Sequence, residues 1–209
     1  MISHIDGELN RKYNDLCNFL KSLDSVFVAF SGGIDSSLLI YLANEFVKEE
    51  CIGITSNSSS VPRNDIKEIK QFVNKYKINH IFLNYEESNL SSDYKSNPKN
   101  RCYYCKSILY SQINNLAKEK KIKFILDGTN ASDICDYRPG NEAAKENNVM
   151  SPLKDFNITK EEIRIIAKNL GLNNWSKAET ACLASRVPYG EEVTIPKLRQ
   201  IDLGEKFIK

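Results

Sequence analysis

Short apolar runs alternate along this chain with longer segments in which apolar residues recur at helical spacing. The β-branched and aromatic run at residues 26–30 predicts a central strand covered on both faces, and residues 36–47 predict the helix that follows it. An opening helix is predicted by the apolar positions Leu9, Tyr13, Leu16 and Leu20. The apolar positions of the helix after the strand are Leu38, Leu39, Leu42, Ala43 and Phe46.

The same alternation continues through the rest of the chain. Further strands are predicted at residues 51–55, 80–83 and 124–126, and Pro62 opens a helix between the first two. Later helical spacing appears at Ile163, Ile166 and Leu170. Strands that alternate with helices predict a doubly wound α/β fold, with a mostly parallel sheet and helices on both faces.

A glycine turn flanked by hydroxyl side chains, Ser-Gly-Gly-Ile-Asp-Ser, joins the first strand to its helix. Gly32 and Gly33 lack Cβ atoms, so the backbone can turn tightly and bring its N–H groups up to an anion. Those N–H groups, the hydroxyls of Ser31 and Ser36 and the positive end of the helix favour a di- or triphosphate. The turn is neither a Walker loop nor a G-x-G-x-x-G dinucleotide fingerprint.

This pattern resembles the phosphate loop of the adenine-nucleotide α-hydrolases, which cleave ATP between its α and β phosphates. The resemblance implies that Asp35 holds Mg²⁺ or orients the phosphates; in a turn that binds nothing, this Asp would have no packing purpose. Ligands of doubly wound sheets bind beyond the carboxyl ends of strands, so residues 31–36, 56–57 and 128–130 should converge on ATP. The expected ATP contacts are Ser31, Gly32, Gly33, Asp35, Ser36, Ser56, Gly128 and Asn130.

Composition narrows the class of protein. The 209 residues are 41% hydrophobic, enough for one good core, and 29 basic against 27 acidic residues give a net charge of +2. This near balance argues against a nucleic-acid-binding arm. No apolar run approaches the roughly 18 residues that span a bilayer, and no signal-peptide core is visible, so we expect no membrane partner and a cytoplasmic location.

Six cysteines in a cytoplasmic chain favour metal ligands, catalytic thiols or core residues over disulfides. The C-x-x-C of Cys102 and Cys105 fits a redox pair, half a zinc site or part of an iron–sulfur site. With Cys182, three thiolates could hold three irons of a four-iron cluster and leave the fourth open; the alternative is a redox or structural pair and an unrelated thiol. We interpret Cys17, Cys51 and His80 as packing or strand residues; His4 is not at ligand spacing, and Cys135 stays undecided.

Several longer segments together resemble the LarE family of ATP-dependent sulfur transferases. These are residues 31–36, 97–106, 127–133, 136–140, 151–153 and 182–190, so the likeness covers nearly the whole chain. The resemblance implies a PP-loop ATP pyrophosphatase domain at residues 1–170 and a C-terminal segment, 171–209, that carries Cys182 and Arg186. It further implies adenylylation of a carboxylate of pyridinium-3,5-biscarboxylate mononucleotide, release of pyrophosphate, and displacement of AMP by sulfur.

The family supplies sulfur in two ways. One branch sacrifices a single cysteine, at the position where this chain has Ala181, and lacks the C-x-x-C. The other branch holds a [4Fe-4S] cluster on three cysteines, and its open iron binds a hydrosulfide. Cys102, Cys105 and Cys182 match the second pattern, so the resemblance implies cluster-dependent, repeated sulfur delivery for the nickel-pincer nucleotide cofactor of lactate racemase.

The resemblance also places charged residues at the site. Lys106 is expected to be catalytic with Asp35 and the three cysteines, by placing positive charge on the nucleotide or the substrate carboxylates. The substrate-binding residues are expected to be Arg101, Asp133, Asp136, Arg138, Ser185 and Arg186. Guanidinium groups bind phosphate and carboxylate bidentately, although a solvated surface role is the alternative for each charged residue.

Two departures from the family pattern concern the end of the chain. The chain is shorter at its C-terminus than the family pattern, and Lys177-Ala178-Glu179 stands where Lys-Pro is expected. The alternatives are a thiolase for tRNA or another small molecule, without a visible RNA-binding appendage, and a nucleotide- or cluster-binding protein that does not turn over. The expected partners are a small-molecule nucleotide, further copies of the chain and a nickel-insertion protein that receives the product.

Overall fold

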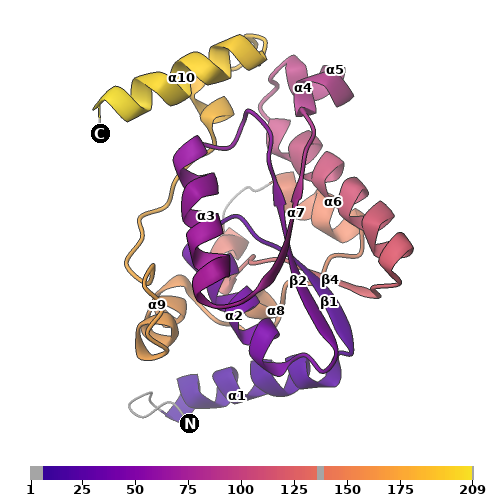
Figure 1. Ribbon diagram of the computed structural model, residues 1–209, viewed down its shortest axis with the longest axis vertical. Helices are drawn as coiled ribbons and strands as arrows, with labels where there is room; N and C mark the ends of the chain where they lie inside the picture. The colour runs from indigo at the N-terminus through magenta and orange to yellow at the C-terminus, as the bar shows by residue number, and fades with distance from the viewer. Residues whose placement is uncertain (1–6, 136–138, 209) are drawn as a thin grey trace.

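Four parallel strands form the sheet in the computed structural model, which describes residues 7–135 and 139–208 (Figure 1). They are β1 (Ser25–Ala29), β2 (Glu50–Ser56), β3 (Asn79–Leu83) and β4 (Phe124–Leu126). Their order is β3-β2-β1-β4, with Val26 of β1 opposite Cys51 of β2 and Phe124 of β4. The predicted strands are therefore confirmed to within one residue at each end, and the predicted α/β fold with a parallel sheet is confirmed.

Helices cover both faces of this sheet (Figure 1). The longer ones are α1 (Gly7–Ser22), α2 (Ile34–Phe46), α3 (Arg63–Lys75), α6 (Arg101–Lys120), α7 (Pro139–Glu146), α9 (Lys160–Asn169) and α10 (Ile195–Ile208). Single-turn helices are α4 (Glu87–Leu90), α5 (Ser92–Lys95) and α8 (Pro152–Asp155), and 3₁₀ turns are η1 (Ala131–Cys135) and η2 (Leu183–Arg186). Among the described residues, no helix is long and apolar enough to cross a membrane.

Two apolar layers hold the helices against the sheet. Val26, Val28 and Phe30 lie in one layer with α1, α2, α3 and α9, whereas Phe27 and Ala29 lie in the other with α6 and α7. Alternation of this kind follows from the two-residue period of a strand. Each fully buried side chain of this size contributes roughly 1.5–3 kcal/mol, so β1 is the strand covered on both faces that the sequence predicts.

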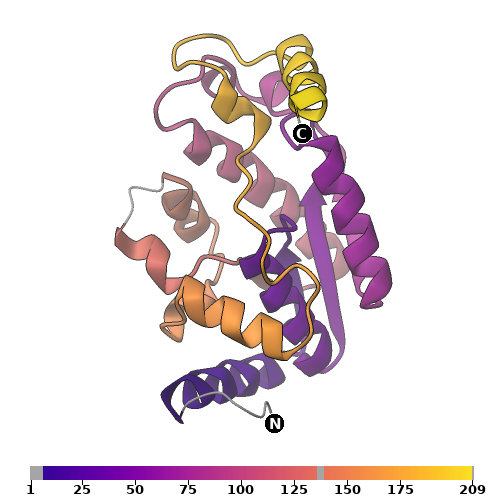
Figure 2. The same cartoon turned by 90° about the vertical axis from the view of Figure 1, so that its left-hand side faces the viewer.

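The end of the chain packs separately from these two layers. After α9 the backbone runs along the molecule to η2 and α10 at its other end (Figure 2). A third apolar cluster there contains Tyr94, Leu183, Ala184, Val187, Val193 and Leu198. Tyr104 and Ile108 of α6 pack against it, so the segment after α9 is held to the first half of α6. The domain boundary at residue 170 stays a prediction.

Candidate active site

A cavity of about 600 Å³ lies at the carboxyl ends of the strands, a usual size for a small-molecule site. Its lining includes Ser31, Asp35 and Ser36 of the glycine turn, Ser56 at the end of β2, and Gly128 after β4. The segments that the sequence predicts to converge therefore do converge, because parallel strands end at one edge of a sheet.

Hydroxyl groups hold the glycine turn in shape. Gly32 has φ +77°, a left-handed conformation that favours glycine. The Ser36 hydroxyl accepts a hydrogen bond from the Ser31 amide (3.2 Å) and donates one to the Gly33 carbonyl (3.1 Å). The Ser31 and Ser36 hydroxyls lie 3.1 Å apart. These hydrogen bonds lie within the turn itself, which leads straight into the positive N-terminal end of α2.

The turn after β4 packs closely on the start of α2. A Cβ atom built at Gly128 would lie 2.8 Å from the Ser36 nitrogen and 3.0 Å from its Cα. The two loops can approach this closely only because Gly128 has no side chain. Backbone groups of both loops therefore face the same part of the cavity.

Asp35 forms an ion pair that the sequence does not reveal. Lys160, the first residue of α9, places its Nζ 2.7 Å from Asp35 Oδ2 and 2.9 Å from Glu179 Oε1. Oδ1 of Asp35 is buried and accepts no hydrogen bond from the described residues. Burial raises the pKa of Asp35, and the hydrogen bond and charge of Lys160 act against that rise. An oxygen without a donor in this position suits a cation ligand.

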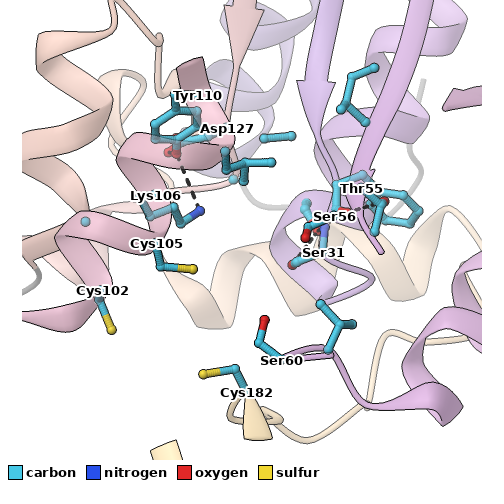
Figure 3. Close-up of a pocket in the computed structure, with 18 of the residues that line it drawn as sticks. Ser31, Thr55, Ser56, Ser60, Cys102, Cys105, Lys106, Tyr110, Asp127 and Cys182 are labelled. Atoms are coloured by element: carbon cyan, nitrogen blue, oxygen red, sulfur yellow. Dashed lines mark hydrogen bonds between the residues drawn. The ribbon is translucent and has the colours of Figure 1, made fainter. Parts of the chain in front are cut away.

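A second charged group enters the cavity from α6. Lys106 lines it and donates to the Tyr110 hydroxyl at 3.4 Å (Figure 3). The Tyr110 hydroxyl in turn donates to Asp127 Oδ2 at 2.9 Å, and Ser151 donates to Asp127 Oδ1 at 2.8 Å. Tyr110 and Asp127 raise the pKa of Lys106, so the lysine stays charged and can bind an anion.

The three cysteines of the predicted sulfur site line the same cavity. Cys102 and Cys105 lie three positions apart on α6 and so share one helix face. Figure 3 shows the Cys182 thiol turned toward the side of the cavity where they lie. Burial raises the pKa of the Cys105 thiol.

The donor set of the cavity includes three cysteine thiols. Among the described residues, no group of three His, Cys, Asp or Glu side chains is close enough to hold one ion. Three cysteine thiols around one cavity are the chemistry that binds a [4Fe-4S] cluster, whose irons are spread apart. The residues present therefore fit a cluster, with one iron left without a protein thiolate.

A buried carboxyl group, that of Glu87, lies beside Cys105 and lines the same cavity. Glu87 is 2% exposed, and its Oε1 accepts hydrogen bonds from the Ser58 and Ser60 hydroxyls, at 2.8 and 3.0 Å. The Cys105 sulfur lies 4.0 Å from the same oxygen, and burial raises the pKa of Glu87. Nothing in the sequence marks Glu87 among the 27 acidic residues, because its burial and its contact with Cys105 arise only in the folded chain.

Of the remaining predicted site residues, Asp133 lines the cavity and several others do not. Asn130 is buried, and its side-chain oxygen accepts a hydrogen bond from the Ser132 amide. Gly33 is the N-cap residue that precedes α2, and Gly32 lies at a smaller cavity of about 280 Å³. Asp136 and Arg138 lie outside the described residues.

Two further predicted substrate contacts point elsewhere. The Ser185 hydroxyl donates to the Cys182 carbonyl at 2.7 Å, and Arg186 pairs with Glu205 of α10 at 2.9 Å. Neither lines the cavity, because the 3₁₀ turn that follows Cys182 carries them to other sides. Arg101 is 4% exposed and absent from the lining as well.

The residues that the sequence assigns to packing are buried or paired. Cys17 and Cys51 are 4% and 8% exposed. His80 Nε2 lies 2.8 Å from the Thr55 hydroxyl, which donates to the Phe30 carbonyl. Burial lowers the pKa of His80 to about 4, so its ring is neutral and donates to Thr55. The side chain of Cys135 lies outside the description.

Comparisons with known proteins show the family to which the chain belongs. The model of the family described as thiamine biosynthesis protein (ThiI) matches residues 22–208. Over 194 residues the chain is 32% identical to pyridinium-3,5-bisthiocarboxylic acid mononucleotide synthase of Lactiplantibacillus plantarum, a LarE protein. The match covers 91% of this chain and 69% of that relative. The chain belongs to the LarE family, with a ThiI-type domain. The resemblance drawn from its sequence motifs is thereby confirmed.

Solved structures share the fold of this LarE-family chain. NMN synthetase from Francisella tularensis superposes with a TM-score of 0.67 and 16% identity, over 97% of this chain and 94% of that one. The U34-tRNA thiolase NcsA from Methanococcus maripaludis, solved with its [4Fe-4S] cluster, gives 0.58 and 19%, over 95% and 74%. At such identities the likeness shows the fold alone.

Proposed function

We propose that this chain is an ATP-dependent sulfur transferase that acts in the cytoplasm on pyridinium-3,5-biscarboxylate mononucleotide. It adenylylates a carboxylate of that substrate, releases pyrophosphate, and replaces AMP with sulfur from a [4Fe-4S] cluster. The observation that carries the proposal is that three cysteines and the glycine turn line one cavity. Membership of the LarE family supports the substrate.

The first half-reaction converts a poor electrophile into a good one. A substrate carboxylate oxygen attacks the α-phosphorus of ATP, the bond to the β-phosphate oxygen breaks, and pyrophosphate leaves. The amides at the start of α2 and the Ser31 hydroxyl would stabilise the charge that develops on the phosphates, while the Ser36 hydroxyl, which donates to the Gly33 carbonyl, holds the turn in shape. Mg²⁺, for which Asp35 Oδ1 is the candidate ligand, would neutralise phosphate charge when bound.

The second half-reaction forms the carbon–sulfur bond. A cluster held by Cys102, Cys105 and Cys182 would leave one iron open for a hydrosulfide, the sulfur donor. Transfer of this sulfur to the acyl carbon would form the carbon–sulfur bond and break both the bond from sulfur to iron and the bond from carbon to the AMP oxygen. AMP would leave with the electron pair of its bond, and the hydrosulfide proton would go to solvent. Lys106 lies beside Cys105 in the cavity, where its charge stabilises the departing AMP or the second substrate carboxylate.

An anaerobic turnover measurement tests this function. The chain is reconstituted with iron and sulfide, given ATP, Mg²⁺, sulfide and the pyridinium dicarboxylate mononucleotide, and assayed for pyrophosphate and thiolated product. We expect substrate-dependent pyrophosphate release, about four irons per chain, and more than one thiolated product per protein molecule. Variants Cys102→Ala, Cys105→Ala and Cys182→Ala should lose the product.

The matched control is Cys51→Ala, which changes a buried cysteine of β2 that does not line the cavity. It should keep its iron and its turnover. A preparation with about one zinc and no iron would contradict the cluster. Folded, iron-loaded protein without substrate-dependent pyrophosphate release would indicate a binding protein. Assembly into an oligomer and transfer of the product to a nickel-insertion protein belong to the same proposal.

A further inference from the structure

Arg101 is a buried arginine at the start of α6, one position before Cys102. Its guanidinium faces the segment that carries Cys182 rather than the cavity. Nη1 donates to the Asn97 side-chain oxygen at 2.6 Å and to the Ala184 carbonyl at 2.8 Å. Nη2 lies 3.9 Å from the Cys182 sulfur, within hydrogen-bond reach of a sulfur acceptor.

Asn97 extends this connection between the two cysteine-bearing segments. It is fully buried, and its side-chain amide donates to the carbonyls of Val187 and Pro188, at 3.2 and 2.8 Å. The Gly190 amide donates back to the Asn97 carbonyl at 3.0 Å. Arg101 and Asn97 thus hold the backbone on both sides of Val187 against the turn that precedes α6.

The charge of Arg101 has no carboxylate partner among the described residues, whose ion pairs all involve other cations. A buried charge without a counter-charge is strongly unfavourable. Of the two Nη atoms of Arg101, Nη2 is the one that faces the Cys182 sulfur. Bound to iron in the proposed cluster, the Cys182 sulfur would place negative charge opposite this guanidinium.

We propose that Arg101 is the positioning residue of the sulfur site: it fixes the Cys182 segment against α6 and supplies the positive charge that the Cys182 sulfur faces. This inference rests on the proposed cluster. It gives Cys182, the third ligand of that cluster, a hydrogen-bonding partner, Arg101, that is not itself a ligand. Partners of this kind orient ligands and tune metal sites. It also replaces the sequence-based expectation that Arg101 contacts substrate.

Arg101→Gln and Arg101→Lys test the two parts of the inference separately. Gln removes the charge and the fork, whereas Lys keeps the charge without the planar fork. In cluster-free protein, amide hydrogen exchange of residues 183–190 should be about tenfold faster or more in Arg101→Gln, because charge-assisted hydrogen bonds are lost. After anaerobic reconstitution, its cluster should show a more negative midpoint potential, since a nearby positive charge favours the reduced state.

Arg101→Lys should keep its iron and a potential near that of wild type, and it serves as the test if the Gln variant does not fold. Arg199→Gln makes the same change at an exposed position of α10 and should match wild type in every measurement. If the exchange rates, the iron content and the midpoint potential of Arg101→Gln all match those of wild type, the inference is overturned. Faster exchange with an unchanged potential would overturn the role of the charge.

The proposed function and the inference fail in different ways. Wild-type protein that binds no iron would contradict the proposed cluster, and with it the effect of Arg101 on a potential. The exchange measurement needs no cluster. Faster exchange in Arg101→Gln would still support Arg101 as the residue that positions Cys182, and wild-type exchange rates would overturn that role too.

Discussion

Asp35 and Lys160 meet across 125 positions of sequence, with 2.7 Å between Lys160 Nζ and Asp35 Oδ2. Asp35 is recognisable from its glycine turn, but Lys160 follows an ordinary helix cap at Thr159 and carries no local signal. Their side chains are 21% and 16% exposed, so water screens the pair only in part. At the scale of single residues, the cation opposite Asp35 can therefore be found only in the folded chain.

Lys160→Met should lower the free energy of unfolding by about 1–3 kcal/mol, because the Asp35 carboxylate loses its charged hydrogen-bond donor while it stays largely buried. The double variant Asp35→Asn/Lys160→Met should recover part of this loss, since the unpaired charge is gone. Urea unfolding measures both values.

Lys197→Met is the matched control for Lys160→Met. Its ion pair with Glu191 spans 3.2 Å between side chains that are 42% and 58% exposed, so its loss should change stability by no more than about 0.5 kcal/mol. A double variant less stable than Lys160→Met alone would show that charge pairing is not what Lys160 contributes.

At the scale of elements, the two glycine-containing turns after β1 and β4 depend on each other. Gly128→Ala would place a methyl group 2.8 Å from the Ser36 nitrogen, a backbone atom that cannot rotate away. We expect a stability loss of about 1–3 kcal/mol and, because the glycine turn shifts, at least about tenfold weaker binding of a non-hydrolysable ATP analogue. Thermal unfolding and titration calorimetry measure the two effects.

Gly204→Ala provides the comparison, since a Cβ atom there meets nothing within 4 Å. In the middle of α10 it should raise stability by roughly 0.5–1 kcal/mol and leave nucleotide binding unchanged. If Gly128→Ala binds the analogue as tightly as wild type, the close packing of the two loops does not shape the phosphate site.

Elements with strong periodicity are the ones that the sequence could predict. The strands and the helices α1, α2, α3 and α9 follow from runs and spacings of apolar residues. The short helices α4, α5 and α8 span four residues each, too few for a period to show. The order of the strands cannot be predicted from any single segment, because it depends on which face of the sheet each connecting helix crosses.

At the scale of the whole molecule, the sequence could predict that strand ends and cysteines share one site, since parallel strands end at one edge. It could not predict which charged side chains point inward. Lys106 lines the cavity, whereas Arg186 pairs with Glu205 and Arg101 turns to the Cys182 segment. The directions of Arg101 and Arg186 follow the packing of η2 and α10 against α6 in the third apolar cluster, whereas Lys106 is held by Tyr110 of its own helix.

Stability of the whole chain should fall in acid through His80. Its pKa is about 4 in the folded protein and about 6.5 in the unfolded chain. Below pH 6.5 the unfolded chain therefore binds a proton that the folded protein does not, and the loss grows until the pH reaches about 4. Because the ring is only partly buried, we expect about 1–2 kcal/mol over this range, measured by urea unfolding as a function of pH.

His80→Gln isolates this contribution from the carboxyl groups. Glutamine can still donate to the Thr55 hydroxyl but does not titrate, so the stability difference between the two proteins should change with pH only between about 6.5 and 4. The raised pKa values of Asp35 and Glu87 act in the opposite direction, because the folded protein binds those protons more readily. They are common to both proteins and cancel in the difference. Parallel stability curves for wild type and His80→Gln would mean that His80 has the same pKa in the folded protein as in the unfolded chain, and would contradict this prediction.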